Sequence, residues 1–84
     1  MPLPNEPVTL SAGQIRELNR QLADLRHEVN NSLSLMTAAV ELIQRRPQDA
    51  GNLWRTLTEQ PRKITGSMSQ FSRDLEAALR ITRP

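Results

Sequence analysis

Apolar residues recur at intervals of three and four along most of this chain, and Pro47 divides the pattern into two stretches. The stripe consists of Ile15, Leu18, Leu22, Leu25, Val29, Met36, Ala39 and Ile43 before the proline, and of Trp54, Leu57, Ile64, Met68, Phe71, Leu75 and Ala78 after it. This spacing places the apolar side chains on one face of a helix, in the heptad-like manner of helical bundles. No segment alternates with a period of two between turn signals, as a half-buried strand does. The sequence therefore predicts an all-α chain.

The first helix is expected over about residues 11–46. Ser11 and Gln14 mark its start, because their spacing is that of a capping box. Ser32 fills one position of the apolar stripe. Pro47 ends the helix, since the residue before a proline is pushed out of helical conformation.

The second helix is expected over about residues 50–82, with Asp49 as its N-cap. Pro61 falls inside this range, where a proline removes one hydrogen bond and normally bends a helix. We expect a kink near Pro61, with two helices in series as the alternative. Residues 1–10 contain three prolines, and we expect a disordered arm there.

The chain has 84 residues, a length at which a single hydrophobic core is marginal. It contains no cysteine and one histidine, which excludes disulfides and argues against a structural zinc site. No cofactor or metal is expected. The short connection makes the two helices an antiparallel hairpin, whose wide stripes stay partly exposed. Two hairpins pairing into a four-helix bundle cover them, so we predict a homodimer.

No signal peptide or membrane-spanning run is expected from the sequence, which favours the cytoplasm and no membrane partner. The net charge of +2 does not demand nucleic acid. Positive residues of the second helix are interpreted as spread around it: Arg55, Arg62, Lys63, Arg73, Arg80 and Arg83. There is no aromatic set for base stacking beyond Trp54 and Phe71 on the apolar stripe. Nucleic-acid binding is therefore the least favoured of the functions considered.

His27 stands near the middle of the first helix. With Leu22 and Leu25 at heptad positions a and d, His27 takes position f, the farthest from the apolar stripe. Its neighbours on that side are all polar: Arg20, Asp24, Asn30, Asn31 and Ser34. We therefore expect an exposed imidazole. On periodicity alone, an idle surface histidine is the simpler interpretation.

The residues next to His27 favour a reactive group. A phosphoacceptor imidazole needs exposure, one nitrogen free to attack and an acceptor for the proton on the other nitrogen. Glu28 can supply that acceptor or act as general base. Asn31, one helical turn on, can bind a phosphoryl group or position a water. The plainer alternative is that Glu28 pairs with an arginine and Asn31 is solvated.

Residues 25–33, LRHEVNNSL, resemble the histidine box of the dimerisation and histidine-phosphotransfer domain of two-component sensor histidine kinases. The likeness extends in pattern to residues 68–73 of the second helix. The resemblance implies that His27 accepts the phosphoryl group, that Glu28 assists and that Asn31 serves dephosphorylation of a response regulator. It also implies a dimeric hairpin.

Two features depart from the family. Ser32 stands where many histidine boxes carry proline, so a straighter first helix is expected. The sequence ends at Pro84, leaving no residues for the family's ATP-binding domain, so autonomous ATP-dependent kinase activity is not expected. His27 also lacks a lysine three residues later, which separates this chain from monomeric phosphotransfer bundles.

The function expected is therefore a phosphotransfer or phosphatase module that exchanges a phosphoryl group between His27 and a response-regulator aspartate. The receiver domain is expected to dock below His27, on Ser34, Thr37, Ala38 and Glu41. A separate ATP-binding domain of a histidine kinase is a further expected partner. The alternative is a non-catalytic dimeric protein that binds or sequesters a kinase or a response regulator.

Overall fold

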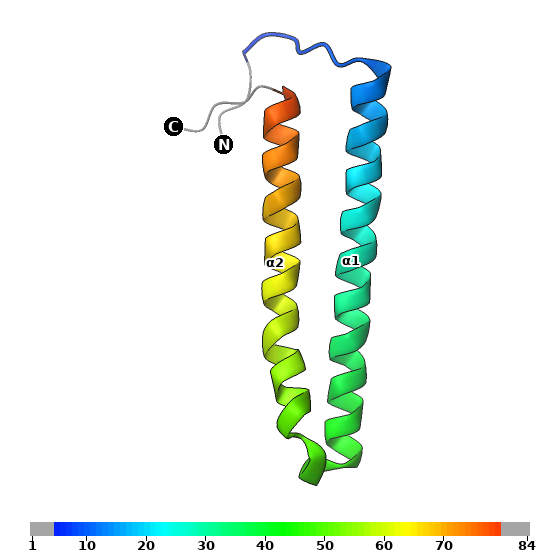
Figure 1. Cartoon of the computed structure of the whole chain (residues 1–84), viewed down its shortest axis with the longest axis vertical. Coiled ribbons are helices and arrows are strands. Elements are labelled where there is room, and N and C mark those ends of the chain that lie inside the picture. Colours follow the sequence, from blue (N-terminus) through cyan, green and yellow to red (C-terminus); the bar gives the residue numbers. More distant parts are fainter. Residues whose placement is uncertain (1–4, 80–84) are drawn as a thin grey trace.

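The chain forms an antiparallel helical hairpin (Figure 1). The computed structural model describes residues 5–79. Helix α1 spans Ala12–Arg45, a 3-10 turn η1 spans Pro47–Asp49, and helix α2 spans Gly51–Leu79. The described part of the chain contains no strand. The prediction of an all-α hairpin is confirmed.

Helix α1 begins with the predicted capping box. The Ser11 hydroxyl accepts a hydrogen bond from the Gln14 backbone N–H at 3.0 Å, and the Gln14 side chain accepts one from the Ser11 N–H at 2.8 Å. Two N–H groups that have no partner inside the helix are thereby satisfied. The last bond joins the Arg46 N–H to the Leu42 carbonyl at 2.8 Å. Pro47 follows at once, and α1 ends there.

The turn corrects one prediction, because Asp49 is not the N-cap of α2. Asp49 is the last residue of η1, and its carboxylate lies 3.9 Å from the Arg46 guanidinium. The first bond of α2 runs from the Trp54 N–H to the Ala50 carbonyl at 3.0 Å. The helix therefore continues directly from the 3-10 turn, and no side-chain cap is needed to start it.

Helix α2 runs through Pro61 without interruption. Side-chain hydroxyls of Thr58 and Thr65 each bond to the carbonyl four residues earlier, at 3.0 Å. The kink near Pro61 stays a prediction. Residues 80–82 of the predicted range lie outside the described residues, as do residues 1–4 of the expected arm. Residues 5–10 carry no helix and cross from the start of α1 toward the end of α2 (Figure 1).

Little of the hairpin is buried. Its smallest dimension is 13 Å, close to the thickness of one helix with its side chains. Among residues 5–79, Ala39 and Ala50 are the only buried apolar residues, whereas Trp54 is 56% exposed. Ser32 is buried, as predicted for its stripe position. The expectation that one hairpin leaves its stripe partly exposed is confirmed.

The exposed apolar residues of α1 lie on two flanks of the line that faces α2. Ala39 marks that line, since it is only 3% exposed. Val40 lies about 100° round the helix to one side, and Leu42 about 60° to the other. We define the apolar flank as the side that carries Val40. It comprises Ile15, Leu22, Leu33 and Val40 of α1 with Trp54 and Met68 of α2.

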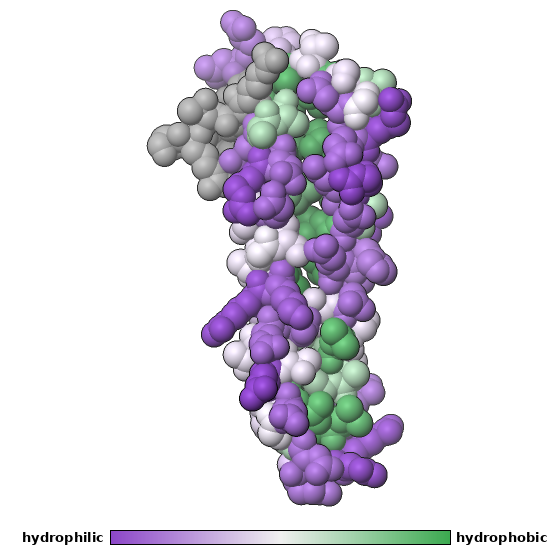
Figure 2. Space-filling view, viewed as in Figure 1, coloured by the Kyte–Doolittle hydropathy of each residue, from purple (hydrophilic) through white to green (hydrophobic). Residues whose placement is uncertain are grey.

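The opposite flank is mainly polar and contains a groove between the helices. Helix α1 contributes Gln21, Asp24, Leu25, Glu28, Asn31, Ser32 and Leu35, and α2 contributes Gln60, Lys63, Gly66, Ser67, Gln70, Phe71 and Asp74. In Figure 2 hydrophilic side chains cover most of the visible face, and hydrophobic surface is concentrated over the lower half of α1. The hairpin thus has one flank that carries most of the exposed large apolar residues and one grooved flank that is mainly polar but also exposes Leu35 and Leu42.

Candidate functional site

His27 is exposed on α1, on the side turned away from α2. The line facing α2 passes through Leu25 and Ser32, and His27 lies on the opposite side of the helix. Its predicted polar neighbours are exposed as well: Arg20, Asp24, Asn30, Asn31 and Ser34. The predicted exposure of the imidazole is confirmed.

A shallow depression lies on the outer side of α1, beginning one turn beyond His27. It is lined by Asn30, Leu33, Ser34, Thr37, Ala38 and Glu41. All four residues predicted for receiver docking are in this set. The Thr37 hydroxyl donates a hydrogen bond to the Leu33 carbonyl at 3.0 Å. The depression and His27 lie on one side of the same helix.

Glu28 is directed toward α2. Its Oε2 accepts a hydrogen bond of 2.6 Å from the Ser67 hydroxyl, which makes the contact a bond between the two helices. The carboxylate is therefore held beside the groove, and its bonded oxygen does not serve the imidazole. The Oε1 atom keeps its full acceptor capacity, since no described residue donates to it.

The structure separates the three predicted site residues. Glu28 and Asn31 both line the groove, whereas His27 does not. Asn31 follows His27 by one turn, so it borders both the outer side of α1 and the groove. Asn31 would thus lie next to both a phosphoryl group on the imidazole and a ligand bound in the groove.

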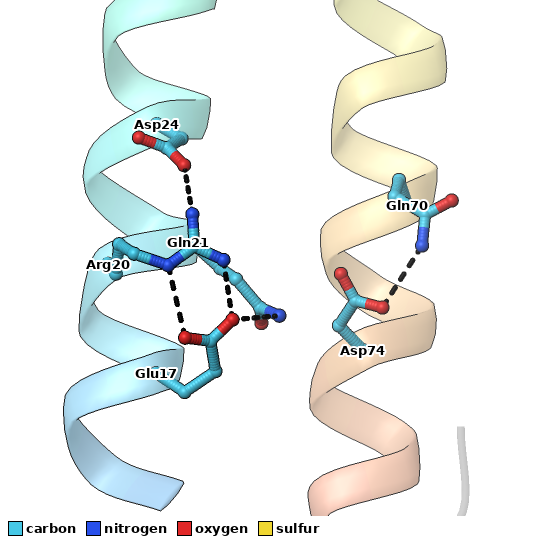
Figure 3. A network of polar contacts seen from close by, with 6 residues as sticks. All are labelled: Glu17, Arg20, Gln21, Asp24, Gln70 and Asp74. Atoms are coloured by element: carbon cyan, nitrogen blue, oxygen red, sulfur yellow. Dashed lines mark hydrogen bonds and ion pairs between the residues drawn. The ribbon is translucent and has the colours of Figure 1, made fainter. Parts of the chain in front are cut away.

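The end of the groove near the start of α1 is rich in carboxylates, and these have partners. Figure 3 shows Arg20 between Glu17 and Asp24, and Gln70 bonded to Asp74 across one turn of α2. The hydrogen bond from Arg20 lowers the pKa of Glu17 below its usual value. Gln21 donates to Glu17, but its buried Oε1 has no partner.

Three groove residues on α2 were missed by the sequence reasoning. Gln60 falls on the buried line of α2, Lys63 was counted among dispersed positive charges, and Ser67 had no assigned role. The signal that could have found Gln60 is its interval of three to four residues from Leu57 and Ile64, which places a polar side chain in an apolar row.

Three arginines of α2 lie on one side of the helix, although the sequence analysis interpreted its positive residues as spread around it. Arg55, Arg62 and Arg73 are seven and eleven residues apart, both close to whole numbers of turns, so they share one outward side. All three are exposed. Glu59 lies near the same side and reduces its net charge.

In the described range no group of three histidine, cysteine, aspartate or glutamate side chains could hold a metal ion. Neither α1 nor α2 is long and apolar enough to span a membrane. Comparisons with protein-family models, with curated proteins and with solved structures find no match to this chain.

Proposed function

We propose that this chain is a two-component phosphotransfer or phosphatase module in which His27 exchanges a phosphoryl group with the aspartate of a response-regulator receiver. The observation that carries the proposal is the exposed imidazole, placed on the same side of α1 as a shallow depression one to four turns away. A receiver seated on Ser34, Thr37, Ala38 and Glu41 would bring its aspartate toward His27.

The chemistry proposed is an exchange between two activated phosphates. An unprotonated imidazole nitrogen attacks the phosphorus of the aspartyl phosphate, the P–O bond to the aspartate breaks, and a phosphohistidine and a free carboxylate result. The proton on the second ring nitrogen goes to solvent or to the free oxygen of Glu28. In the phosphatase direction, Asn31 positions a water that attacks the same phosphorus and releases inorganic phosphate.

A homodimer is the second part of the proposal. Two copies packed through the apolar flank form a four-helix bundle with both His27 side chains outward. The exposure of Leu22, Trp54 and Met68 supports this arrangement, because each of these side chains remains at least 40% exposed within one hairpin. A separate ATP-binding domain of histidine-kinase type would be the source of the phosphoryl group.

The test is incubation of the protein with a receiver phosphorylated on its aspartate. We expect label on the wild-type chain, none on His27→Gln, and receiver dephosphorylation slowed roughly 100-fold in Asn31→Ala. Circular dichroism of each variant checks that the helices remain. Label on the His27→Gln chain, or no change in aspartyl phosphate with any receiver of the same organism, would contradict the proposal.

A non-catalytic interaction protein is the second candidate, and the bond between Ser67 and Glu28 favours it. That bond, 2.6 Å long, occupies an oxygen of the residue proposed to assist His27. Under this alternative the hairpin binds a kinase or a response regulator and His27 is idle. Partner binding and cellular output unchanged in His27→Ala, together with no phosphoryl transfer, would establish it.

A further inference from the structure

We propose that the grooved flank binds a basic amphipathic helix of a partner protein. The surface that carries this proposal is a strip of α1, named here the groove strip, formed by Asp24, Glu28, Leu35 and Leu42. Successive members are four, seven and seven residues apart, close to whole numbers of turns, so they share one side of the helix. All four are exposed. The partner helix carries apolar side chains toward one end and lysines or arginines toward the other.

The end of the groove strip nearer to the turn is apolar. Leu35 is 45% exposed and Leu42 is 46% exposed, and hydrophobic surface gathers over that half of α1 in Figure 2. The proposed dimer does not cover them, because they lie on the other side of the line through Ala39 from Val40. Apolar residues at intervals of seven are the anchors used when one helix lies in a groove. This end of the strip therefore fits leucine-like side chains of the partner.

The end of the groove strip nearer to the start of α1 is acidic. Asp24 and Glu28 lie there on α1, and Asp74 lines the groove from α2. Lys63 is the one cationic side chain that lines the groove within residues 5–79, so three carboxylates against one ammonium give a net charge of −2. Arg20 offsets little of this charge, since it is shared between Asp24 and a second carboxylate. Cationic side chains of a partner complement this end.

The two walls of the groove bring their carboxylates to similar heights. The bond of 2.6 Å between Ser67 and Glu28 fixes the register of the two helices. Asp74 follows Ser67 by seven residues and Asp24 precedes Glu28 by four, so their heights along the axis differ by about 4.5 Å. From Asp24 to Leu42 the strip is about 27 Å long, which five turns of a partner helix span.

A second copy of this chain fits the same surface poorly. Two grooved flanks packed in parallel would place carboxylates against carboxylates, which repel each other. Packed antiparallel, they would place Asp24 and Glu28 against the leucines of the other copy, which costs the desolvation of charged groups. A partner with an apolar and a basic end avoids both costs.

The inference goes beyond the proposed function, because it needs neither His27 nor a phosphoryl group. His27 does not line the groove. His27→Ala should therefore leave binding of the partner helix unchanged. Loss of phosphoryl transfer with helix binding retained would contradict the proposed function alone.

The probe is a synthetic helical peptide of about 18 residues, with leucines at intervals of three and four toward one end and lysines toward the other. The comparison peptide carries glutamate in place of each lysine. In NMR titrations of the isotopically labelled protein, we expect saturable shifts of the Leu35 and Leu42 methyl signals with the lysine peptide. The glutamate peptide should bind at least about tenfold more weakly. Equal affinities, or shifts centred on Val40 and Trp54 of the apolar flank, would overturn the proposal.

Leu42→Ala tests the apolar end. It should weaken binding of the lysine peptide about tenfold, because it truncates one of the two anchors. Its matched control is Val40→Ala, which truncates a side chain of similar exposure, 42%, on the apolar flank. The control should leave the affinity within about twofold.

The double variant Asp24→Asn with Asp74→Asn tests the acidic end. At low salt it should also weaken binding about tenfold, since two exposed charge pairs are lost. Its control, Glu41→Gln with Glu59→Gln, removes two carboxylates that do not line the groove and should change the affinity by no more than about twofold. Circular dichroism checks that each variant keeps its helices. Equal weakening by a variant and its control would overturn the proposal, because binding would then follow overall charge or apolar content and not the groove strip.

Discussion

At the scale of single residues, some polar side chains are hydrogen-bonded to other side chains and others are not. Arg20 is engaged twice, with Glu17 and with Asp24, one turn away on either side. All three side chains are more than half exposed, so solvent weakens the contribution of these pairs to stability. Ser67 engages Glu28 from the other helix. His27 is left as an exposed imidazole with no carboxylate held against it.

Arg20→Ala should raise the pKa of Glu17 toward its unperturbed value, because the hydrogen bond from Arg20 is the main cause of the lowered pKa. A lowered carboxylate pKa contributes stability that is present above the unfolded pKa and is lost as the pH falls through the folded pKa. The free energy of unfolding of the wild-type protein should therefore decrease slightly as the pH falls below about 4.5, and this decrease should be smaller in Arg20→Ala. NMR titration of the Glu17 carboxyl carbon measures the shift, with Arg16→Ala as the control that should leave it unaltered.

At the scale of the helices, α1 is well defined at its start, while α2 carries two weak positions. Substituting a serine N-cap normally costs about 1 kcal/mol, and Ser11 makes both bonds of the capping box. Pro61 removes one backbone bond inside α2. Gly66, five residues on, adds the backbone freedom of a glycine. The middle of α2 is therefore the less stable part of the hairpin.

Gly66→Ala should stabilise the protein by about 1 kcal/mol, the usual difference between the two residues inside a helix. A Cβ at Gly66 meets no atom within 4 Å, so no clash offsets the gain. Urea unfolding followed by circular dichroism measures it. Gly51→Ala, equally free of clashes but at the first residue of α2, should change stability less. A loss of stability in Gly66→Ala would show that the glycine is needed for a bend.

At the scale of the whole molecule, the large exposed area of the hairpin favours association with a second copy. The accessible surface is 6611 Å², against about 5,000 Å² for a compact monomer of this mass. The excess exceeds the roughly 800 Å² that each partner buries in a standard interface. The apolar flank is the side on which a second copy would remove most apolar surface from water. This is the physical basis of the proposed dimer.

Val40→Lys and Leu42→Lys form a matched pair for the dimer. The two side chains are similarly exposed, 42% and 46%, and lie on opposite sides of the line through Ala39. A lysine on the apolar flank places a charge in the proposed interface, so Val40→Lys should convert the dimer to monomer and lower its melting temperature. Leu42→Lys should leave the dimer intact. Sedimentation equilibrium measures both, and a wild-type monomer or equal effects of the two changes would contradict the interface.

Much of the fold could be predicted because its signals are local. The capping box depends on residues three apart, and the end of α1 depends on one proline. The exposure of His27 follows from its interval to Leu22 and Leu25 within one helix. Asp49 was wrongly predicted as an N-cap, since a 3-10 turn placed the start of α2 one residue later than the sequence suggested. Whether Asp49 caps α2 or ends a 3-10 turn depends on how the chain reverses direction between the two helices.

The candidate site could be predicted only in part, for the same reason. His27, Glu28 and Asn31 were found together because they are neighbours in sequence. Their separation, with Glu28 and Asn31 in the groove and His27 outside it, depends on how α1 is rotated against α2. The Ser67 bond joins residues 39 apart, and no periodicity within either helix predicts such a pair.

The sequence by itself determined two long helices, the faces they bury and the outward position of His27, because the 3.6-residue turn relates every residue of a helix to its own neighbours. Only the tertiary structure decided which residues of α1 oppose which residues of α2. That alignment set the partner of Glu28 and brought Lys63 to the groove that Asn31 borders. Contacts between helices depend on the rotation and register of both, and these are settled by packing.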